Sequence, residues 1–183
     1  MTHIDPQLLL AKAGRIRLLV TDVDGVLTDG SIIYNGQGEQ IQIFHVHDGL
    51  GLNLLRKAGI EVAIISSRSS RALATRASEL GIDKVFQGHN DKIAVYQGLL
   101  NELNIRDQEA CYIGDDWVDL PLLKRVGFSV TVLDAPPPLH DYVDYVTGKN
   151  GGRRAVREVC DLILRAKNKW AALLNEIINS SLD

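Results

Sequence analysis

The sequence predicts an α/β fold, a single doubly wound, Rossmann-like parallel sheet with a protruding β-hairpin and no cap domain. Short apolar runs without polar alternation recur along the 183-residue chain, which is the pattern of strands buried on both faces of a parallel sheet. Segments with helical apolar spacing separate most of these runs, and this alternation implies helices on both faces of the sheet. Because a chain of this length commonly folds as one unit, we expect one domain over residues 1–183.

The individual elements follow from the same patterns. The expected strands are the apolar runs at residues 16–21, 60–66, 84–87, 110–114 and 128–133. The expected helices are residues 48–58, 69–81, 91–103, 121–126 and one long helix over 153–178, with a short helix or arm in 1–14. Three of these helices have predicted N-cap residues, namely Asp48, Ser69 or Ser70, and Asp91. Prolines 136–138 predict a rigid connector, and the glycine-rich residues 148–152 predict a flexible joint before the C-terminal tail, residues 152–178.

One stretch interrupts the alternation of strands and helices. Residues 31–34 and 39–46 flank the sequence Asn-Gly-Gln-Gly, so we expect a β-hairpin over residues 31–46. In its second arm Ile41, Ile43 and His45 share one face, while Gln42 and Phe44 share the other. A lone two-stranded ribbon is marginally stable in water. We therefore expect its apolar face to rest on another subunit.

Composition excludes several classes of protein. The net charge of −3 argues against a nucleic-acid partner, which would require a basic surface. No apolar run approaches the roughly 20 residues that a membrane span needs, and residues 1–14 lack the order of a signal peptide. Cys111 and Cys160 have no metal-ligand spacing and predict reduced thiols. The expected location is the cytoplasm.

Asp22 and Asp24 leave the first expected strand at its carboxyl end, where ligands bind in open α/β sheets. Alternate residues point the same way, so both carboxylates can face one site, and a divalent cation would offset their repulsion. Gly25 lets the chain turn close to a bound group. The alternatives are an acidic turn or a calcium loop of the EF-hand type. The EF-hand pattern fits poorly, because it needs Gly at the sixth position and Glu at the twelfth, where this chain has Ile33.

A second acidic stretch follows the run at 110–114. Asp115 is the predicted ligand there, and an oxygen-rich, sulfur-free site suits Mg²⁺. Asp116 and Asp119 are interpreted as helix caps. Ser66 ends another strand and Lys92 begins a helix, where its charge opposes the helix dipole and indicates an anionic partner. Taken singly, a Ser at a strand end is more often a cap, and a Lys at a helix start is more often a solvated residue.

In this order the four positions resemble the motifs of the haloacid dehalogenase-like hydrolase superfamily. The matching motifs are Asp22-x-Asp24-Gly25, Ser66, Lys92 and Gly114-Asp115-Asp116-x-x-Asp119. The resemblance implies that Asp22 is the nucleophile that takes the phosphate and that Asp24 is the general acid and base. It also implies that Ser66 and Lys92 hold the phosphate. Mg²⁺ would be held by Asp22, the backbone carbonyl of Asp24 and Asp115.

The intervals between these motifs leave no room for the cap domain of larger superfamily members. Within the superfamily the chain is similar to the 3-deoxy-D-manno-octulosonate 8-phosphate phosphatases, in the stretches DVDGVLTDG, FHVHDGLG, EVAIISSR, GDDWVDLPLL and GGRRAVREVCDLIL. That family implies a homotetramer acting in lipopolysaccharide precursor synthesis, with the hairpin between subunits and the tail closing a neighbour's site. The implied substrate contacts are Asp24, His45, Val46, His47, Asp48, Gly49, Arg68, Arg76 and Lys92. The chain departs from the family pattern at Ser66-Ser67, where relatives often have Thr-Gly, at Asn53, where some relatives have Arg, and at Arg154, where relatives commonly have Gly.

The residue types agree with a phosphorylated sugar acid, because Arg68, Arg76 and Arg153 can each form paired hydrogen bonds with phosphate or carboxylate. For Arg76 a solvated helix face is an equal alternative. His45 and His47 are expected to point apart, which argues against a zinc pair. The rival functions are a phosphatase for a related nine-carbon keto sugar acid phosphate, a broad sugar phosphatase, a phosphomutase and a non-catalytic oligomerising module.

Overall fold

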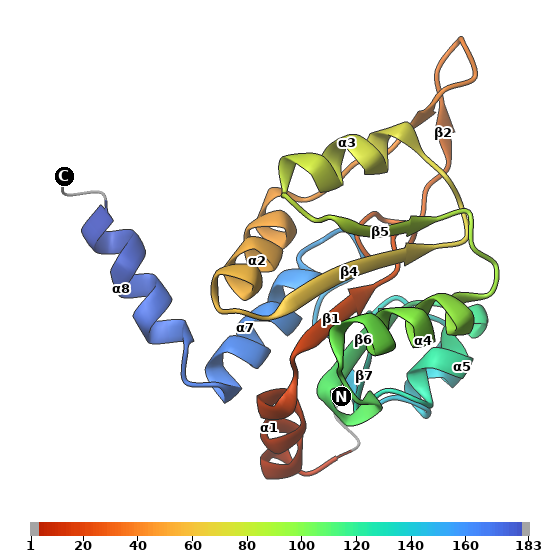
Figure 1. Cartoon of the computed structure of the whole chain (residues 1–183). Coiled ribbons are helices and arrows are strands. Elements are labelled where there is room, and N and C mark those ends of the chain that lie inside the picture. The colour runs from red at the N-terminus through yellow and green to blue at the C-terminus, as the bar shows by residue number, and fades with distance from the viewer. Residues whose placement is uncertain (1–3, 181–183) are drawn as a thin grey trace.

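The computed structural model describes residues 4–180 and has a six-stranded parallel sheet at its centre (Figure 1). The strand order is β5-β4-β1-β6-β7-β8, and every neighbouring pair is parallel. The bounds are β1 Leu18–Thr21, β4 Glu61–Ser66, β5 Lys84–Gln87, β6 Ala110–Gly114, β7 Phe128–Thr131 and β8 Tyr145–Val146. The doubly wound fold class is confirmed. Five of these strands were predicted, β5 and β6 with the bounds observed, and the two-residue edge strand β8 was missed.

The order of the strands creates a switch point beside β1. The chain first moves outward from β1 to β4 and β5, then returns to place β6, β7 and β8 on the other side. Connections therefore leave the carboxyl ends of β1 and β6 in opposite directions, which opens a crevice there. All four residues of β1 are buried, and so are all five of β6, because helices cover both faces of the sheet.

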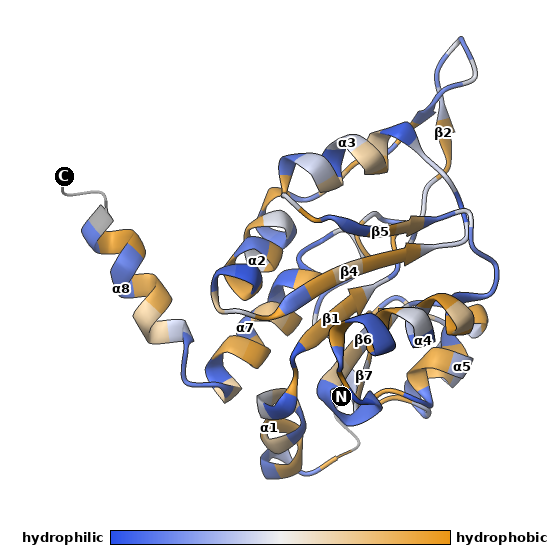
Figure 2. Ribbon diagram, viewed as in Figure 1, coloured by the Kyte–Doolittle hydropathy of each residue, from blue (hydrophilic) through white to orange (hydrophobic). Residues whose placement is uncertain are grey.

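Helices cover the two faces of the sheet (Figure 1). On one face α1 (Pro6–Arg15) and α2 (Val46–Lys57) both contact α7 (Ala155–Ala166). On the other face lie α4 (Lys92–Leu103) and α5 (Leu120–Leu123), while α3 (Arg71–Glu79) follows β4. The remaining short elements are the 3-10 turns η1 (Asp107–Glu109) and η2 (Trp117–Asp119) and the short helix α6 (Pro137–His140). Figure 2 shows the strands as apolar segments between amphipathic helices.

The hairpin is present with a short ladder. Strands β2 (Ile33–Tyr34) and β3 (Gln40–Ile41) pair antiparallel and project from the body of the protein (Figure 1). The prediction that its second arm reaches Val46 is wrong, because Val46 is already the first residue of α2. His45 caps that helix by accepting from the His47 backbone N–H at 3.1 Å, so the prediction of Asp48 as the cap is also wrong.

Of the two candidates Ser69 and Ser70, Ser70 is the N-cap of α3, and the prediction of Asp91 as the N-cap of α4 is confirmed. Two connectors differ from expectation. Residues 137–140, which begin within the predicted proline connector and extend past it, form the single turn α6. Gly151 and Gly152 do not form a loose joint, because Gly152 N–H donates to the Val26 carbonyl at 2.9 Å and Gly151 N–H to the Asp134 carboxylate at 2.9 Å.

The prediction of one long C-terminal helix over 153–178 is wrong. Helix α7 ends at Ala166, and a separate helix α8 (Trp170–Ser180) extends away from the body (Figure 1). The break occurs at Asn168, whose φ of 57° is left-handed, a conformation that Asn tolerates better than most residues. The lysines on either side hold the turn in place, since Lys167 donates to the Gly14 carbonyl at 3.0 Å and Lys169 to the Ala58 carbonyl.

Among the described residues no helix is both long and apolar enough to cross a membrane. Cys111 and Cys160 are both free and buried, and burial raises the pKa of each thiol well above its ordinary value. Neither thiol is therefore reactive.

Candidate active site

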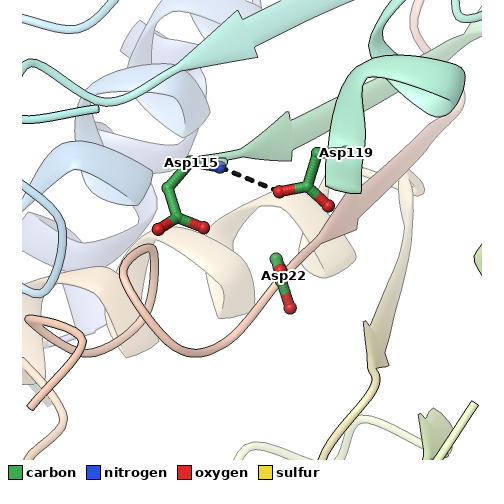
Figure 3. A group of neighbouring side chains, drawn as sticks. All are labelled: Asp22, Asp115 and Asp119. Atoms are coloured by element: carbon green, nitrogen blue, oxygen red, sulfur yellow. Dashed lines mark hydrogen bonds between the residues drawn. The ribbon is translucent and has the colours of Figure 1, made fainter. Parts of the chain in front are cut away.

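Three carboxylates meet at the carboxyl edge of β1 and β6 (Figure 3). Asp22 directly follows β1, Asp115 directly follows β6, and Asp119 lies in the 3-10 turn η2 that comes next. One oxygen from each lies within 4.8 Å of the others. Because β1 and β6 are hydrogen-bonded neighbours in parallel register, the two strands deliver Asp22 and Asp115 to the same point. The predicted meeting of these two residues is present.

Lys92 is the cation of this cluster. Its ammonium donates to Asp22 Oδ2 at 2.6 Å and to Asp119 Oδ1 at 2.8 Å, and its side chain is buried. Tyr112 on β6 donates a second hydrogen bond to Asp119 Oδ1 at 2.6 Å. Lys92 is the first residue of α4, so the helix that Asp91 caps brings the ammonium directly against the nucleophile candidate. Its unfavourable place on its own helix is thus explained by two carboxylates.

Charge in the cluster is unbalanced. Three carboxylates face one ammonium, so with all of them ionised the cluster carries a net charge of −2. Burial, and then the Asp119 carboxylate, raise the pKa of Asp22 to about 6, while burial together with Asp22 and Asp119 raises the pKa of Asp115 to about 7. Burial by itself would lower the pKa of Lys92, but Asp22 and Asp119 raise it above its ordinary value. One divalent cation would neutralise this excess.

The hydrogen bonds separate the roles of Asp115 and Asp119. Asp119 Oδ1 accepts from Lys92 and Tyr112, and its Oδ2 accepts from the backbone N–H groups of Asp115 and Asp116 at 3.0 and 3.3 Å. Four hydrogen bonds occupy its acceptor sites. In the described part of the chain no group donates to the Asp115 carboxylate, which therefore remains available to a cation. Asp116 caps η2, as expected, by accepting from the Trp117 N–H at 2.7 Å.

The donor set fits Mg²⁺. All of the available atoms are oxygens, and the ion prefers one or two carboxylates while it retains several waters. Asp22 and Asp115 meet this requirement, whereas Asp119 acts on Lys92 and on the 114–116 turn. The role of Asp119 as a buried partner of Lys92 was missed from the sequence, although its place in the Gly-Asp-Asp-x-x-Asp pattern was visible.

The loop after Asp22 is shaped by glycines. Gly25 has a φ of +83°, and a Cβ there would lie 2.0 Å from Asp115 Oδ2, so only glycine fits beside that carboxylate. On its other side the loop contacts Gly151, where a Cβ would lie 1.7 Å from the Gly25 carbonyl oxygen. The backbone at the start of the tail therefore packs directly against the Asp22–Gly25 turn.

Asp24 lies beside the hairpin and beside Arg68. Its Oδ1 accepts from Gln42 Nε2 at 3.0 Å, and its Oδ2 lies 3.5 Å from Arg68 Nε. The contact with Gln42 was not anticipated, although the alternation of the second arm had already placed Gln42 on the face opposite Ile41 and Ile43.

Ser66 is buried at the carboxyl end of β4, the neighbour of β1, as predicted. Its Oγ accepts from the Arg68 N–H at 3.2 Å and keeps its own proton available as a donor. Ser66 therefore stands at the same sheet edge as Asp22 and Lys92.

The segment 45–49 and Arg76 form a separate group. No hydrogen bond or ion pair in the described chain joins their side chains to the carboxylate cluster. Arg76 pairs with Glu79 at 3.0 Å and lies against Gly49, where a Cβ would be 2.3 Å from Arg76 Nη2. His45 and His47 do not point apart, since their rings meet edge to face with centroids 5.0 Å apart.

Asp48 departs most from expectation. It is buried, and its carboxylate accepts from the backbone N–H groups of Arg154 at 3.2 Å and Arg157 at 2.7 Å. Helix α7 has no side-chain cap of its own, and its N-cap residue Arg154 has a left-handed φ of 79°. Asp48 thus caps the N-terminus of a different helix, one that is remote in sequence.

Comparisons with known proteins agree with this geometry. A family model described as haloacid dehalogenase-like hydrolase matches residues 77–159. The 3-deoxy-D-manno-octulosonate 8-phosphate phosphatase of Yersinia pestis is 47% identical over 161 residues, covering 88% of this chain and 86% of that protein. The Escherichia coli K12 protein of the same name is 46% identical over the same shares of both chains.

Solved structures give the same result. The Moraxella catarrhalis 3-deoxy-D-manno-octulosonate 8-phosphate phosphatase, in complex with magnesium, phosphate and KDO, superposes with a TM-score of 0.91 at 43% identity, covering 94% of this chain and 99% of that one. The Yersinia pestis structure has a TM-score of 0.88 at 46% identity, covering 90% of this chain and 89% of that one.

Proposed function

The chain belongs to the family of 3-deoxy-D-manno-octulosonate 8-phosphate phosphatases, within the haloacid dehalogenase-like hydrolases, and we propose that it hydrolyses this ester to KDO and phosphate with Mg²⁺. The observation that carries the proposal is the cluster of Asp22, Asp115 and Lys92 at the crevice beside β1. Support for the substrate comes from the Moraxella catarrhalis relative, whose structure contains magnesium, phosphate and KDO.

In the proposed mechanism the Asp22 carboxylate attacks phosphorus. A bond forms between Asp22 and phosphorus while the bond from phosphorus to the leaving alcohol breaks, and Asp24 gives that alcohol its proton. Asp24 then takes a proton from a water molecule that attacks the same phosphorus, which releases phosphate and restores Asp22. Mg²⁺ bound by Asp22, Asp115 and the backbone carbonyl of Asp24 would offset charge on the transferring group.

Lys92 and Ser66 complete the assignment at the phosphate. The ammonium of Lys92 holds Asp22 Oδ2, and the Val23 N–H holds Oδ1 at 2.7 Å, so the nucleophile has one fixed orientation. The third donor of the Lys92 ammonium makes only a long contact of 3.3 Å with the Tyr112 hydroxyl, so with phosphate bound it can donate to a phosphate oxygen in place of that contact. The Ser66 hydroxyl supplies one further neutral donor.

We assign substrate binding to Arg68, Arg76 and residues 45–49, with one change. Arg68 is half exposed beside Asp24 and can reach a negatively charged ligand in front of it. The side chain of Asp48 is committed to α7, so any contact from this residue to the substrate would come from its backbone.

The homotetramer is a further part of the proposal. Ile32, Tyr34 and Ile43 on the hairpin are 54%, 59% and 59% exposed, as expected for a face that a partner covers in the assembly. Among the described residues β2 and β3 form a sheet of their own with no third strand, and such a ribbon is marginally stable by itself. We assign the protein to the cytoplasm and the reaction to lipopolysaccharide precursor synthesis on the family resemblance alone.

Phosphate release from a panel of sugar phosphates tests the proposal. With Mg²⁺ present, we expect KDO 8-phosphate to have a far higher kcat/KM than a nine-carbon keto sugar acid phosphate or simple hexose phosphates. Asp22→Asn should fold but show no turnover. It should bind Mg²⁺, and any ligand that is held through Mg²⁺, only weakly. Equal rates across the panel would replace the narrow assignment with a broad sugar phosphatase, and full activity of Asp22→Asn would exclude it as the nucleophile.

A further inference from the structure

The second arm of the hairpin has an inverted pattern. Ile41 and Ile43 are 45% and 59% exposed, whereas the amide groups of Gln40 and Gln42 turn inward. A solvated strand normally turns its apolar residues inward and its polar residues outward. Polar groups that face inward require hydrogen-bond partners, so the inward amides indicate a polar contact between the hairpin and the body of the protein.

The inward amide of Gln42 holds Asp24. Gln42 Nε2 donates to Asp24 Oδ1 at 3.0 Å, while Oδ2 is in an ion pair with Arg68 Nε at 3.5 Å, so the only hydrogen bond to this carboxylate among the described residues comes from Gln42. An ionised carboxylate only accepts hydrogen bonds, and this determines which end of the Gln42 amide faces it. The hydrogen bond on one oxygen and the ion pair on the other together restrain the orientation of the carboxyl group as well as its position.

The neighbouring glutamine supports the same arrangement. Gln40 Oε1 accepts from Arg68 Nη2 at 3.4 Å, which restrains the ion-pair partner of Asp24. In the described chain two buried atoms of these amides, Gln40 Nε2 and Gln42 Oε1, have no hydrogen-bond partner. Each such atom has a cost in stability, because it has lost its hydrogen bonds to water without gaining a partner. An arrangement that keeps this cost is expected where the contact serves a function.

We propose that Gln42 is a positioning residue that holds Asp24 in line to give its proton to the leaving alcohol. The inference rests on the proposed phosphatase function and adds to it a residue from outside the four motifs. Proton transfer requires the acid within hydrogen-bond reach of the alcohol oxygen, and a misplacement of about 1 Å reduces the rate by up to about 100-fold. Gln42 acts through Asp24 and does not itself touch the reacting atoms.

Two substrates with different leaving groups test this role. A sugar phosphate releases an alcohol that must be protonated, while p-nitrophenyl phosphate releases a stable phenolate that needs no proton. For Gln42→Met, which keeps the length but removes the donor, we expect kcat/KM to fall about 10- to 100-fold for KDO 8-phosphate and less than about threefold for p-nitrophenyl phosphate. Gln42→Lys restores a donor of similar reach and should recover most of the loss.

The control is Gln97→Met, an exposed glutamine of α4, which should change neither rate. Equal losses on both substrates, or no loss on either, would overturn the positioning role. A wild-type protein that hydrolyses neither substrate would instead overturn the proposed function, and the inference with it. Thermal unfolding of both Gln42 variants shows whether they are folded. If folded Gln42→Lys does not recover the lost activity, this result would also argue against the positioning role.

Discussion

Replacement of Asp48 by alanine should destabilise the protein through a helix in which Asp48 does not lie. The carboxylate caps α7 by accepting from the N–H groups of Arg154 and Arg157 at 3.2 and 2.7 Å. The substitution leaves both N–H groups without a partner at a part-buried helix end. It also removes a negative charge from the positive end of the helix dipole.

The magnitude follows from these losses. Loss of an N-cap costs about 0.5–2 kcal/mol, and a buried donor left unpaired costs about 1–3 kcal/mol. Burial raises the pKa of Asp48, so ionising this carboxylate in the fold already has a cost that the variant avoids. We expect a net loss of about 3 kcal/mol, which for a chain of this size corresponds to a fall in Tm of about 6–12 °C.

Thermal and urea unfolding of three variants measure this effect. Asp48→Asn keeps one acceptor oxygen and should lose about 1 kcal/mol. Asp161→Ala removes a carboxylate that pairs with Arg157 on the surface of the same helix at 2.9 Å, and it should cost only a few tenths of a kcal/mol. A loss for Asp48→Ala no larger than that for Asp161→Ala would refute the assignment of Asp48 as the cap of α7.

Three other predictions concern the site and the assembly. Gly151→Ala would bring a Cβ to 1.7 Å from the Gly25 carbonyl oxygen, so turnover and Tm should both fall. Gly148→Ala, whose Cβ would have its nearest atom at 3.6 Å, should be tolerated, and equal Tm values for the two variants would contradict this prediction. In the folded protein the pKa of Asp22 is about 6 and that of Asp115 about 7, against an ordinary value of 3.8, so the folded state retains protons that the unfolded chain has released. The Tm of the metal-free protein should therefore fall as pH rises from about 4 to about 7, and a Tm that does not change over this range would contradict the prediction. Ile43→Lys places a charge on the exposed hairpin face and should sediment as a smaller species than wild type, while an intact tetramer would argue against assembly through the hairpin.

Much of the fold was predictable from local pattern. Strands buried on both faces appear as continuous apolar runs, so β5 and β6 were located to the residue. The N-caps were located from their position before helical spacing, Asp91 to the residue and Ser70 as one of two candidates. The break at Asn168 was missed because apolar residues continue with helical spacing on both sides of it. Only the left-handed backbone of Asn168 and the anchoring by its neighbouring lysines separate the two helices.

The candidate site was predictable where chemistry is local to a strand end. Asp22 and Asp115 follow adjacent strands, so topology alone brings them together. Asp119 does act as a local cap, since it accepts from the Asp116 N–H at the start of η2, but its bond with Lys92 was missed. Asp48 was misjudged because an acidic residue near a helix start fits a local cap equally well. The partners that were missed, Lys92 and the N-terminus of α7, are 27 and more than 100 residues away in sequence, and only packing brings them close.

Calorimetric titration of Mg²⁺ into chelator-treated protein tests most directly whether Asp22 and Asp115 hold a cation. Wild type should bind one ion per chain, and Asp115→Asn should lose that binding while retaining its fold, because its carboxylate is the one without a protein donor. Binding that is unchanged in Asp115→Asn, or hydrolysis of KDO 8-phosphate that continues at full rate in chelator, would contradict the account.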